Sequence, residues 1–164
     1  MATKRFVKSA DTDTPASRSQ SQLENLLRRY GASGFGVQSD YEHHTIRVMF
    51  RVPDVPGGQL VVPIRLEVSI EAIAEALFGG LRGREQWSAR GWEQAERVAW
   101  RHLVLWVDAA CAATTAGLQT MSEAFLAHAL VKAPDGTVKR VVELLNDVAG
   151  DGGYRGLLQA GPSR

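Results

Sequence analysis

The feature that most constrains the fold is a long helical pattern from Glu93 to Gly117. Apolar or small residues recur there in steps of three, four and seven, which place side chains on one helix face. This face consists of Trp92, Ala99, Leu103, Trp106, Ala110 and Ala113. Ser88 is the predicted N-cap, because its hydroxyl can accept a hydrogen bond from an amide of the first turn. At 1.5 Å per residue, a helix from Ser88 to Gly117 is about 45 Å long.

The second half of this helix is apolar nearly all round. Asp108 is the one charge between Leu103 and Leu118, and a second apolar strip consists of Val104, Val107 and Cys111. A helix of this kind is buried on several sides. It is predicted to be the central core helix or to pack on a second copy of the chain, with Trp92, Leu103 and Trp106 as its interface. Asp108 and the paired threonines interrupt the apolar run. The run is therefore too short to span a membrane, which requires about 20 apolar residues.

Three strands are predicted between Phe35 and Val68. The ranges are Phe35–Tyr41, Thr45–Val52 and Leu60–Val68, and a turn cluster separates the last two. Arg47, Arg51, Arg65 and Glu67 alternate outward from apolar neighbours. Arginines on such a face either contact phosphate or line the solvated side of an antiparallel sheet.

Short helices flank this core. One opens at Ser19 or Ser21 and ends at Gly31, and a second is capped by Ser69 and ends at Gly79. A third is expected from Ser122 to Leu130. The turn Pro134-Asp135-Gly136 then leaves two alternatives. Val131 and Val138 form a small hairpin, or Thr137 caps a helix from Val138 to Val148.

This order of elements predicts an α+β fold. A small three-stranded antiparallel sheet packs on the long central helix, with short flanking helices. Residues 1–18 lack apolar periodicity and are predicted to be a flexible arm. Residues 19–149 form the single domain, and the glycine-rich residues 150–164 form a loose tail. Because Met1–Arg5 contains no apolar leader segment, we expect a cytoplasmic protein.

Neither a cofactor nor a metal is expected. The single cysteine, Cys111, cannot form an internal disulfide. His43 and His44 are adjacent on an expected turn or strand edge, and because neighbours on a strand point to opposite faces, we do not expect them to share one metal ion. No phosphate-cradling glycine loop or nucleophile elbow is present. An enzymatic function remains an alternative only if the fold brings acid–base groups together. The candidates for these groups are His102, His128, Asp108 and Glu123.

The better signal combines basic and aromatic residues. The net charge is only +1, but the basic residues cluster in the first thirty positions and again between Arg82 and Arg101. Arginine binds phosphate and tryptophan stacks on bases. The predicted nucleic-acid-binding residues are Arg28, Arg29, Arg82, Arg84, Trp87 and Arg90. One alternative is that Trp87 and Trp92 anchor the loop before the long helix on the core. Another is that Arg28 and Arg29, in the last turn of the first helix, interact favourably with the helix dipole.

Several segments resemble a family of small proteins of phage, prophage and plasmid-borne gene sets. The segments are Leu26-Leu-Arg-Arg-Tyr-Gly-Ala, Ala99-Trp-Arg-His-Leu-Val-Leu-Trp-Val, Ala116-Gly-Leu-Gln-Thr-Met-Ser-Glu-Ala-Phe-Leu-Ala-His and Ala133-Pro-Asp-Gly-Thr-Val. The resemblance implies a mobile-element setting and no chemistry. The α-β-β-β-α order also resembles, in topology only, the double-stranded-RNA-binding domain. We therefore expect a non-enzymatic accessory protein that contacts DNA, RNA or a nucleic-acid-bound complex. The alternative is a self-assembling or inhibitory protein-interaction module.

Overall fold

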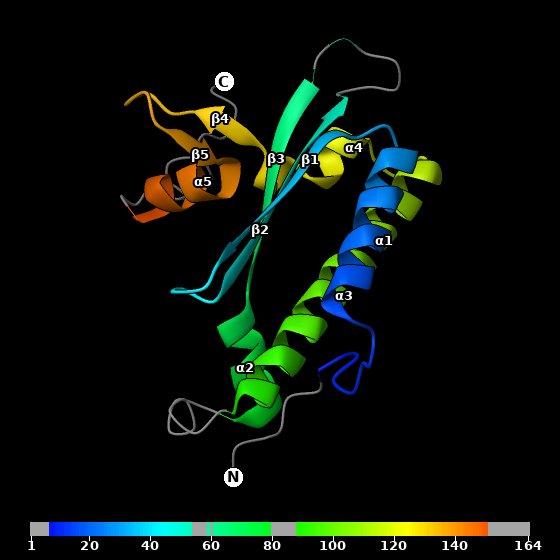
Figure 1. Cartoon of the computed structure of the whole chain (residues 1–164). Helices are drawn as coiled ribbons and strands as arrows, with labels where there is room; N and C mark the ends of the chain where they lie inside the picture. Colours follow the sequence, from blue (N-terminus) through cyan, green and yellow to red (C-terminus); the bar gives the residue numbers. More distant parts are fainter. Residues whose placement is uncertain (1–6, 54–58, 60, 80–87, 151–164) are drawn as a thin grey trace, which may run out of the picture.

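The chain folds as the predicted α+β architecture (Figure 1). The computed structural model describes residues 7–53, 59, 61–79 and 88–150. The first part contains α1 (Ala16–Arg29), β1 (Ser33–Asp40), β2 (Thr45–Pro53), β3 (Val61–Ser69) and α2 (Ile70–Phe78). The second part contains α3 (Ala89–Thr115), α4 (Met121–Ala124), the 3-10 helix η2 (Leu126–His128), β4 (Leu130–Lys132), β5 (Val138–Arg140) and α5 (Val141–Gly150).

The sheet has the order β1-β2-β3, and both pairings are antiparallel. On β2 the side chains of Ile46, Val48, Phe50 and Val52 alternate inward and are at most 2% exposed. They face the helical layer of α1 and α3, while α5 and the β4–β5 hairpin lie beside β3, at the edge of the sheet (Figure 1). Alternation of apolar residues therefore sets which face of the sheet carries the core.

The buried face of α3 differs from the predicted one. Leu103 and Ala99 are buried as expected, but Trp106 is 41% exposed and Trp100, which the predicted series omits, is 2% exposed. Val107 and Cys111 of the second apolar strip are fully buried. The reason is that successive parts of α3 meet α2, α1, the sheet and α4, so that different turns bury different sides.

The predicted caps of α2 and α3 are confirmed, but the start predicted for the first helix at Ser19 or Ser21 is wrong, because α1 begins at Ala16 after Pro15 and has no side-chain cap. The hydroxyl of Ser69 accepts a hydrogen bond from the Ala72 amide at 3.1 Å, and the hydroxyl of Ser88 accepts one from the Gly91 amide at 3.2 Å. Each hydroxyl satisfies an amide that has no partner inside the helix. Gly31 follows α1 with a φ of 84°, a conformation that glycine adopts without steric cost.

The region after α3 corrects one prediction. The helix expected from Ser122 to Leu130 is wrong, because α4 ends at Ala124 and is followed by η2 and then β4. A bridge from Ala129 to Ile64 of β3 holds the chain extended at this point. Of the two alternatives for the next segment, the hairpin is confirmed, since Lys132 pairs with Val138. The last helix starts at Val141, three residues later than the other alternative expected.

Residues 7–15, directly before α1, lie against α3. Helix α1 begins at Ala16, so the arm is shorter than the predicted residues 1–18. Gln94 of α3 donates hydrogen bonds through Nε2 to the carbonyls of Ala10 and Thr12, at 2.9 and 3.2 Å. His102 Nε2 lies 2.7 Å from the carbonyl of Lys8. The tail predicted at residues 150–164 lies outside the described residues, apart from Gly150, where α5 ends.

Candidate nucleic-acid interface

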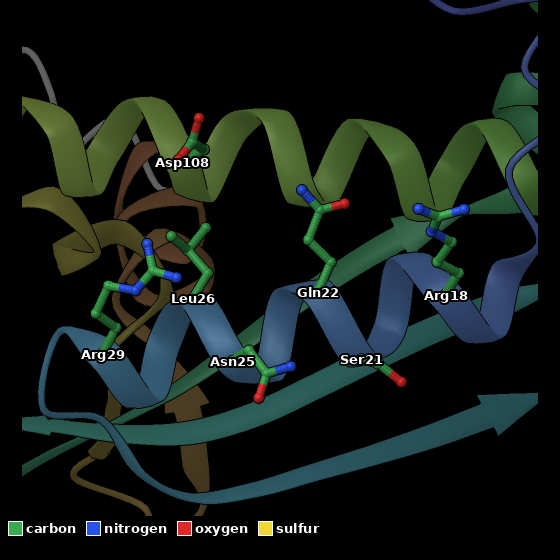
Figure 2. A pocket seen from close by; sticks show the side chains of 7 residues that line it. All are labelled: Arg18, Ser21, Gln22, Asn25, Leu26, Arg29 and Asp108. Atoms are coloured by element: carbon green, nitrogen blue, oxygen red, sulfur yellow. The ribbon is translucent and has the colours of Figure 1, made fainter.

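Helices α1 and α3 run side by side in the same direction (Figures 1 and 2). Arg101 of α3 donates a hydrogen bond to Gln22 of α1 at 3.0 Å. Further along both helices, the Thr115 hydroxyl donates to the Tyr30 hydroxyl at 3.3 Å. We name this line of polar contacts between α1 and α3 the seam. Beneath the seam, Leu23, Leu26 and Leu27 belong to the core. The seam therefore has an apolar floor and polar edges.

A groove of about 540 Å³ follows this seam. Figure 2 shows Arg18 and Arg29 at opposite ends of the α1 stretch, with both side chains pointing toward α3. The groove is lined by Arg18, Ser21, Gln22, Asn25, Leu26, Arg29 and Asp108. Serine, amide and guanidinium groups donate hydrogen bonds, so the lining is suited to oxyanions, while Asp108 opposes them.

The arginines along the seam share two helix faces. Arg18 and Arg29 are eleven residues apart on α1, and a separation of eleven residues returns to the same face. Arg90, Arg97 and Arg101 are spaced by seven and four on α3, which again defines one face, and Asp108 follows seven residues later. We name Arg18, Arg29, Arg90, Arg97 and Arg101 the arginine row. Arg29, at the far end of the row, lines the same groove as Asp108 of α3. The row therefore extends along α3 from Arg90 to about the position of Asp108, a length of about 27 Å at 1.5 Å per residue.

Most of the row is not neutralised by carboxylates. Arg97 pairs with Glu93 in an i, i+4 ion pair. Among the described residues, Arg18, Arg29, Arg90 and Arg101 form no ion pair, although Arg101 is hydrogen-bonded to Gln22. Arg18, Arg29 and Arg90 are exposed. The row therefore presents positive charge that carboxylates of the described chain compensate only locally.

A second hollow continues the seam toward the start of α3. Its volume is about 470 Å³, and Arg90, Gln94 and Arg97 line it from the helix. Asp11 and Asp13 of the arm line its other side. This end of the row therefore faces carboxylates of the arm, whereas Asp108 of α3 is the acidic residue that lines the groove between α1 and α3.

The structure places the predicted nucleic-acid residues unevenly. Arg29 and Arg90 lie on the row. Arg28 belongs to a different face of α1 and pairs with Glu24 at 2.7 Å, with its side chain 72% exposed. Arg82, Arg84 and Trp87 lie outside the described residues.

Sequence reasoning missed three members of the row. By sequence alone, Arg97 and Arg101 belong to an ordinary solvent face of the helix, and Arg18 is only part of a basic segment. The signal that identifies them is the spacing of seven and four from Arg90, together with the spacing of eleven from Arg29. That signal has meaning only once α1 and α3 are known to lie in parallel, so that the two faces meet.

The three residues predicted for a protein interface also separate. Leu103 is 7% exposed and packs in the core. Trp92 is partly buried and stacks on His44, with ring centroids 3.9 Å apart. Trp106 alone among them is exposed, and its ring meets those of Phe125 and His128 edge-on at 5.4 and 5.2 Å. The indole is therefore held in place while part of it faces outward.

Two of the candidate acid–base groups meet in a smaller hollow beside Trp106. His102 and His128 line this space of about 220 Å³ with apolar neighbours from β3 and α3. Glu123 is absent from its lining, because its carboxylate caps α4 by accepting from the Thr120 amide at 2.7 Å. The remaining carboxylate of the lining, Glu67, accepts a hydrogen bond from Arg47. The hollow thus brings together two imidazoles with no nucleophile to activate, and it supports no particular reaction class.

Two of the three outward arginines of the sheet, Arg47 and Arg65, are engaged in ion pairs, whereas Arg51 forms none with a described residue. Arg47 pairs with Glu67 at 3.2 Å and lies 3.8 Å from Asp40. Arg65 donates to both oxygens of Glu143 on α5, at 2.9 and 3.1 Å. This face therefore offers less free positive charge than the arginine row does.

The described residues hold no group of three or more His, Cys, Asp or Glu side chains placed to bind a metal ion. Within the same part of the chain, none of the helices has the length and apolar character that crossing a membrane requires. Comparison with protein-family models, curated proteins and solved structures finds no match.

Proposed function

We propose that this chain is a non-enzymatic accessory protein that binds nucleic acid along the arginine row. The observation that carries the proposal is that four of the five arginines form no ion pair among the described residues. Because they project from two packed helices, their backbone positions are fixed relative to one another. Guanidinium groups fixed in this way bind phosphates by paired hydrogen bonds.

The dimensions of the row suit a nucleic-acid backbone. Its length of about 27 Å corresponds to about eight steps of duplex DNA at 3.4 Å each. The side chains between the arginines on α1 are serine and amides, which also donate hydrogen bonds to phosphate and sugar. None of these contacts reads base identity. We therefore propose backbone binding without sequence preference, as part of a phage or other mobile-element gene set.

The net charge of +1 sets the expected strength of this binding. With so little overall charge, long-range attraction is weak and affinity depends on the local row. Non-specific binding by a few phosphate contacts falls in the range of about 10⁻⁴ to 10⁻⁶ M at physiological salt. We expect affinities in this range, and tighter ones at low salt.

Fluorescence anisotropy with labelled single- and double-stranded DNA and RNA tests the proposal. The informative variant is Arg29→Gln with Arg90→Gln, which removes one charge from each end of the row. On duplex DNA, the slope of log affinity against log salt should fall by about 0.9 for each phosphate that the variant no longer neutralises. Affinity should weaken for every sequence alike.

A matched control separates the row from general charge. Arg51 and Lys132 are exposed and lie away from the seam, so Arg51→Gln with Lys132→Gln changes the net charge equally. We expect this variant to keep the wild-type salt slope. Equal weakening in the two double variants would show that the row has no special role, and undetectable binding by wild type at low salt would rule out the function.

One observation favours a second function, a protein-interaction module that uses α3. Trp106 is exposed although it lies on the central helix, and exposed alanines and Leu118 extend the uncharged surface toward the end of α3. Exposed tryptophans that are held rigidly are common anchors of protein interfaces. We propose this role as the alternative, with a second copy of the chain as the partner to be tested first.

A further inference from the structure

The arm before α1 is attached to α3 by an unusual set of contacts. The Gln94 side chain is hydrogen-bonded to the carbonyls of Ala10 and Thr12, and the His102 side chain is hydrogen-bonded to the carbonyl of Lys8. In all three hydrogen bonds the acceptor is main chain of the arm and the partner is a side chain of α3. These contacts fix the path of the arm while leaving its side chains available for other roles.

Two side chains of the arm that line the seam are acidic, whereas Lys8, whose carbonyl lies at His102, is basic. Asp11 and Asp13 are exposed and line the hollow of about 470 Å³ opposite Arg90 and Arg97. Neither carboxylate forms an ion pair with a described residue, so each acts on the arginines through space. A through-space attraction of this kind lowers the positive potential that an incoming phosphate meets.

We infer that residues 7–15 form an autoinhibitory strap, whose two carboxylates shield the Arg90 and Arg97 end of the row from nucleic acid. This inference rests on the proposed function. A phosphate that approaches this end is repelled by both carboxylates as well as by Glu93. Release of the strap from Gln94 and His102 removes both carboxylates from the Arg90 and Arg97 end, together with Lys8 at the His102 contact, and leaves the helix arginines in place.

The hydrogen bonds make release feasible. All three join side chains of α3 to main-chain carbonyls, and water can replace each of them on release. A partner that holds the arm elsewhere therefore increases nucleic-acid binding without any change in α1 or α3. The regulated step is access to the row, and the row itself stays assembled.

The full-length chain with Asp11→Asn and Asp13→Asn tests the strap by anisotropy on a labelled DNA duplex. Asparagine keeps the size of each side chain and removes its charge. We expect affinity to rise roughly three- to tenfold at low salt, from two repulsions at separations of several ångströms in water. The gain should shrink as salt approaches the concentration at which exposed charges are screened.

Glu42→Gln with Asp147→Asn is the matched control. Both residues are exposed and lie away from the seam, and the net charge changes equally. Asp147→Asn also frees Lys139 from an ion pair at 2.9 Å, which makes the control stringent. We expect a gain of less than about twofold, because charges more than a Debye length from the bound phosphates are screened.

A second variant, Gln94→Ala, removes two of the three strap hydrogen bonds and keeps both acids. We expect faster hydrogen exchange of the arm amides and a smaller gain in affinity, because His102 still holds Lys8. If nucleic acid binds but the Asp11/Asp13 variant matches wild type or the control, the strap is overturned and the proposed function stands. If neither wild type nor any variant binds nucleic acid at low salt, the proposed function is ruled out, and the strap inference is ruled out with it.

Discussion

At the scale of single residues, burial sets the chemistry of Cys111 and of His128, one of the four candidate acid–base groups. Burial, aided by the charge of Asp108, raises the pKa of the Cys111 thiol to about 11. The thiolate is therefore scarce at neutral pH, and Cys111 behaves as the small buried hydrophobe that its helix position indicated. Burial and the nearby charge of Arg140 lower the pKa of His128.

His128 gives a prediction about pH. Its pKa is lower in the folded chain than its ordinary value of 6.5, so the unfolded chain takes up a proton first as the pH falls. The free energy of unfolding should therefore decrease as the pH falls below 7 through 6.5 toward the lower folded value. We expect His128→Gln to flatten this dependence, measured by urea denaturation at several pH values between 7 and 5.

The carboxylates of Asp40 and Glu123 do not interfere in that range. The pKa values of Asp40 and Glu123 are lowered below 3.8 and 4.5, mainly by hydrogen bonds from the backbone amides of His43 and Thr120. Their contribution to stability disappears only at more acidic pH. Identical slopes for wild type and His128→Gln between pH 7 and 5 would contradict the assignment.

At the scale of elements, the ends of the helices were predictable where one residue type decides them. Ser69 and Ser88 cap their helices through hydroxyl oxygens, which local sequence identifies. Helix α3 ends where Gly117 takes a φ of 73°, and the next amide, that of Leu118, donates to the Ala113 carbonyl at 3.0 Å. The end of the helix expected after Ser122 was not predictable, because the bridge from Ala129 to β3 decides it.

Gly117 supplies the prediction at this scale. A side chain there meets no neighbouring atom within 4 Å, so the cost of Gly117→Ala comes from the left-handed backbone alone. We expect a decrease of about 1–2 kcal/mol in the free energy of unfolding, measured by chemical denaturation.

Gly36→Ala is the matched control, because it also meets open space but has an ordinary strand conformation. It should be neutral within about 0.5 kcal/mol. Equal effects of the two substitutions would mean that space or solvation, and not backbone conformation, determines the cost at Gly117.

At the scale of the whole molecule, α3 organises the fold because most of the other helices and the sheet contact it. The helix is long enough that α2, α1 and α4 occupy successive parts of it. Its exposed surface is therefore divided into the arginine row on one side and the region around Trp106 on another. These two surfaces carry the two functions proposed above, and they can be tested separately.

Trp106→Glu tests the second surface. If a second copy packs on it, sedimentation velocity should show an assembly for wild type and a folded monomer for the variant, since a charge in an apolar interface is costly. Leu145→Glu on α5 is the control, because Leu145 is 40% exposed and Trp106 is 41% exposed.

We expect the control to keep the wild-type assembly state. Near-ultraviolet circular dichroism checks that both variants stay folded. An unfolded Trp106→Glu chain would instead assign the indole to the core, through its contacts with Phe125 and His128.

The sequence by itself determined the fold class and the elements up to the end of α3, apart from the start of α1. Alternating apolar residues specify the strands and the buried face of β2, helical periodicity specifies α3, and serine hydroxyls mark the starts of α2 and α3. These signals are local, because each depends on residues within one or two turns or strand steps of one another. Arg29 and Arg90 were also recognised as candidates from their basic neighbours alone.

Only the tertiary structure decided which side of α3 is buried and which charges act together. Trp106 is exposed and Trp100 buried because α1, α2, α4 and the sheet contact different turns of the same helix. Arg18 and Arg101 are distant in the chain and join one row only because α1 lies parallel to α3. Charges interact through distance in space, which helical periodicity within one element does not specify.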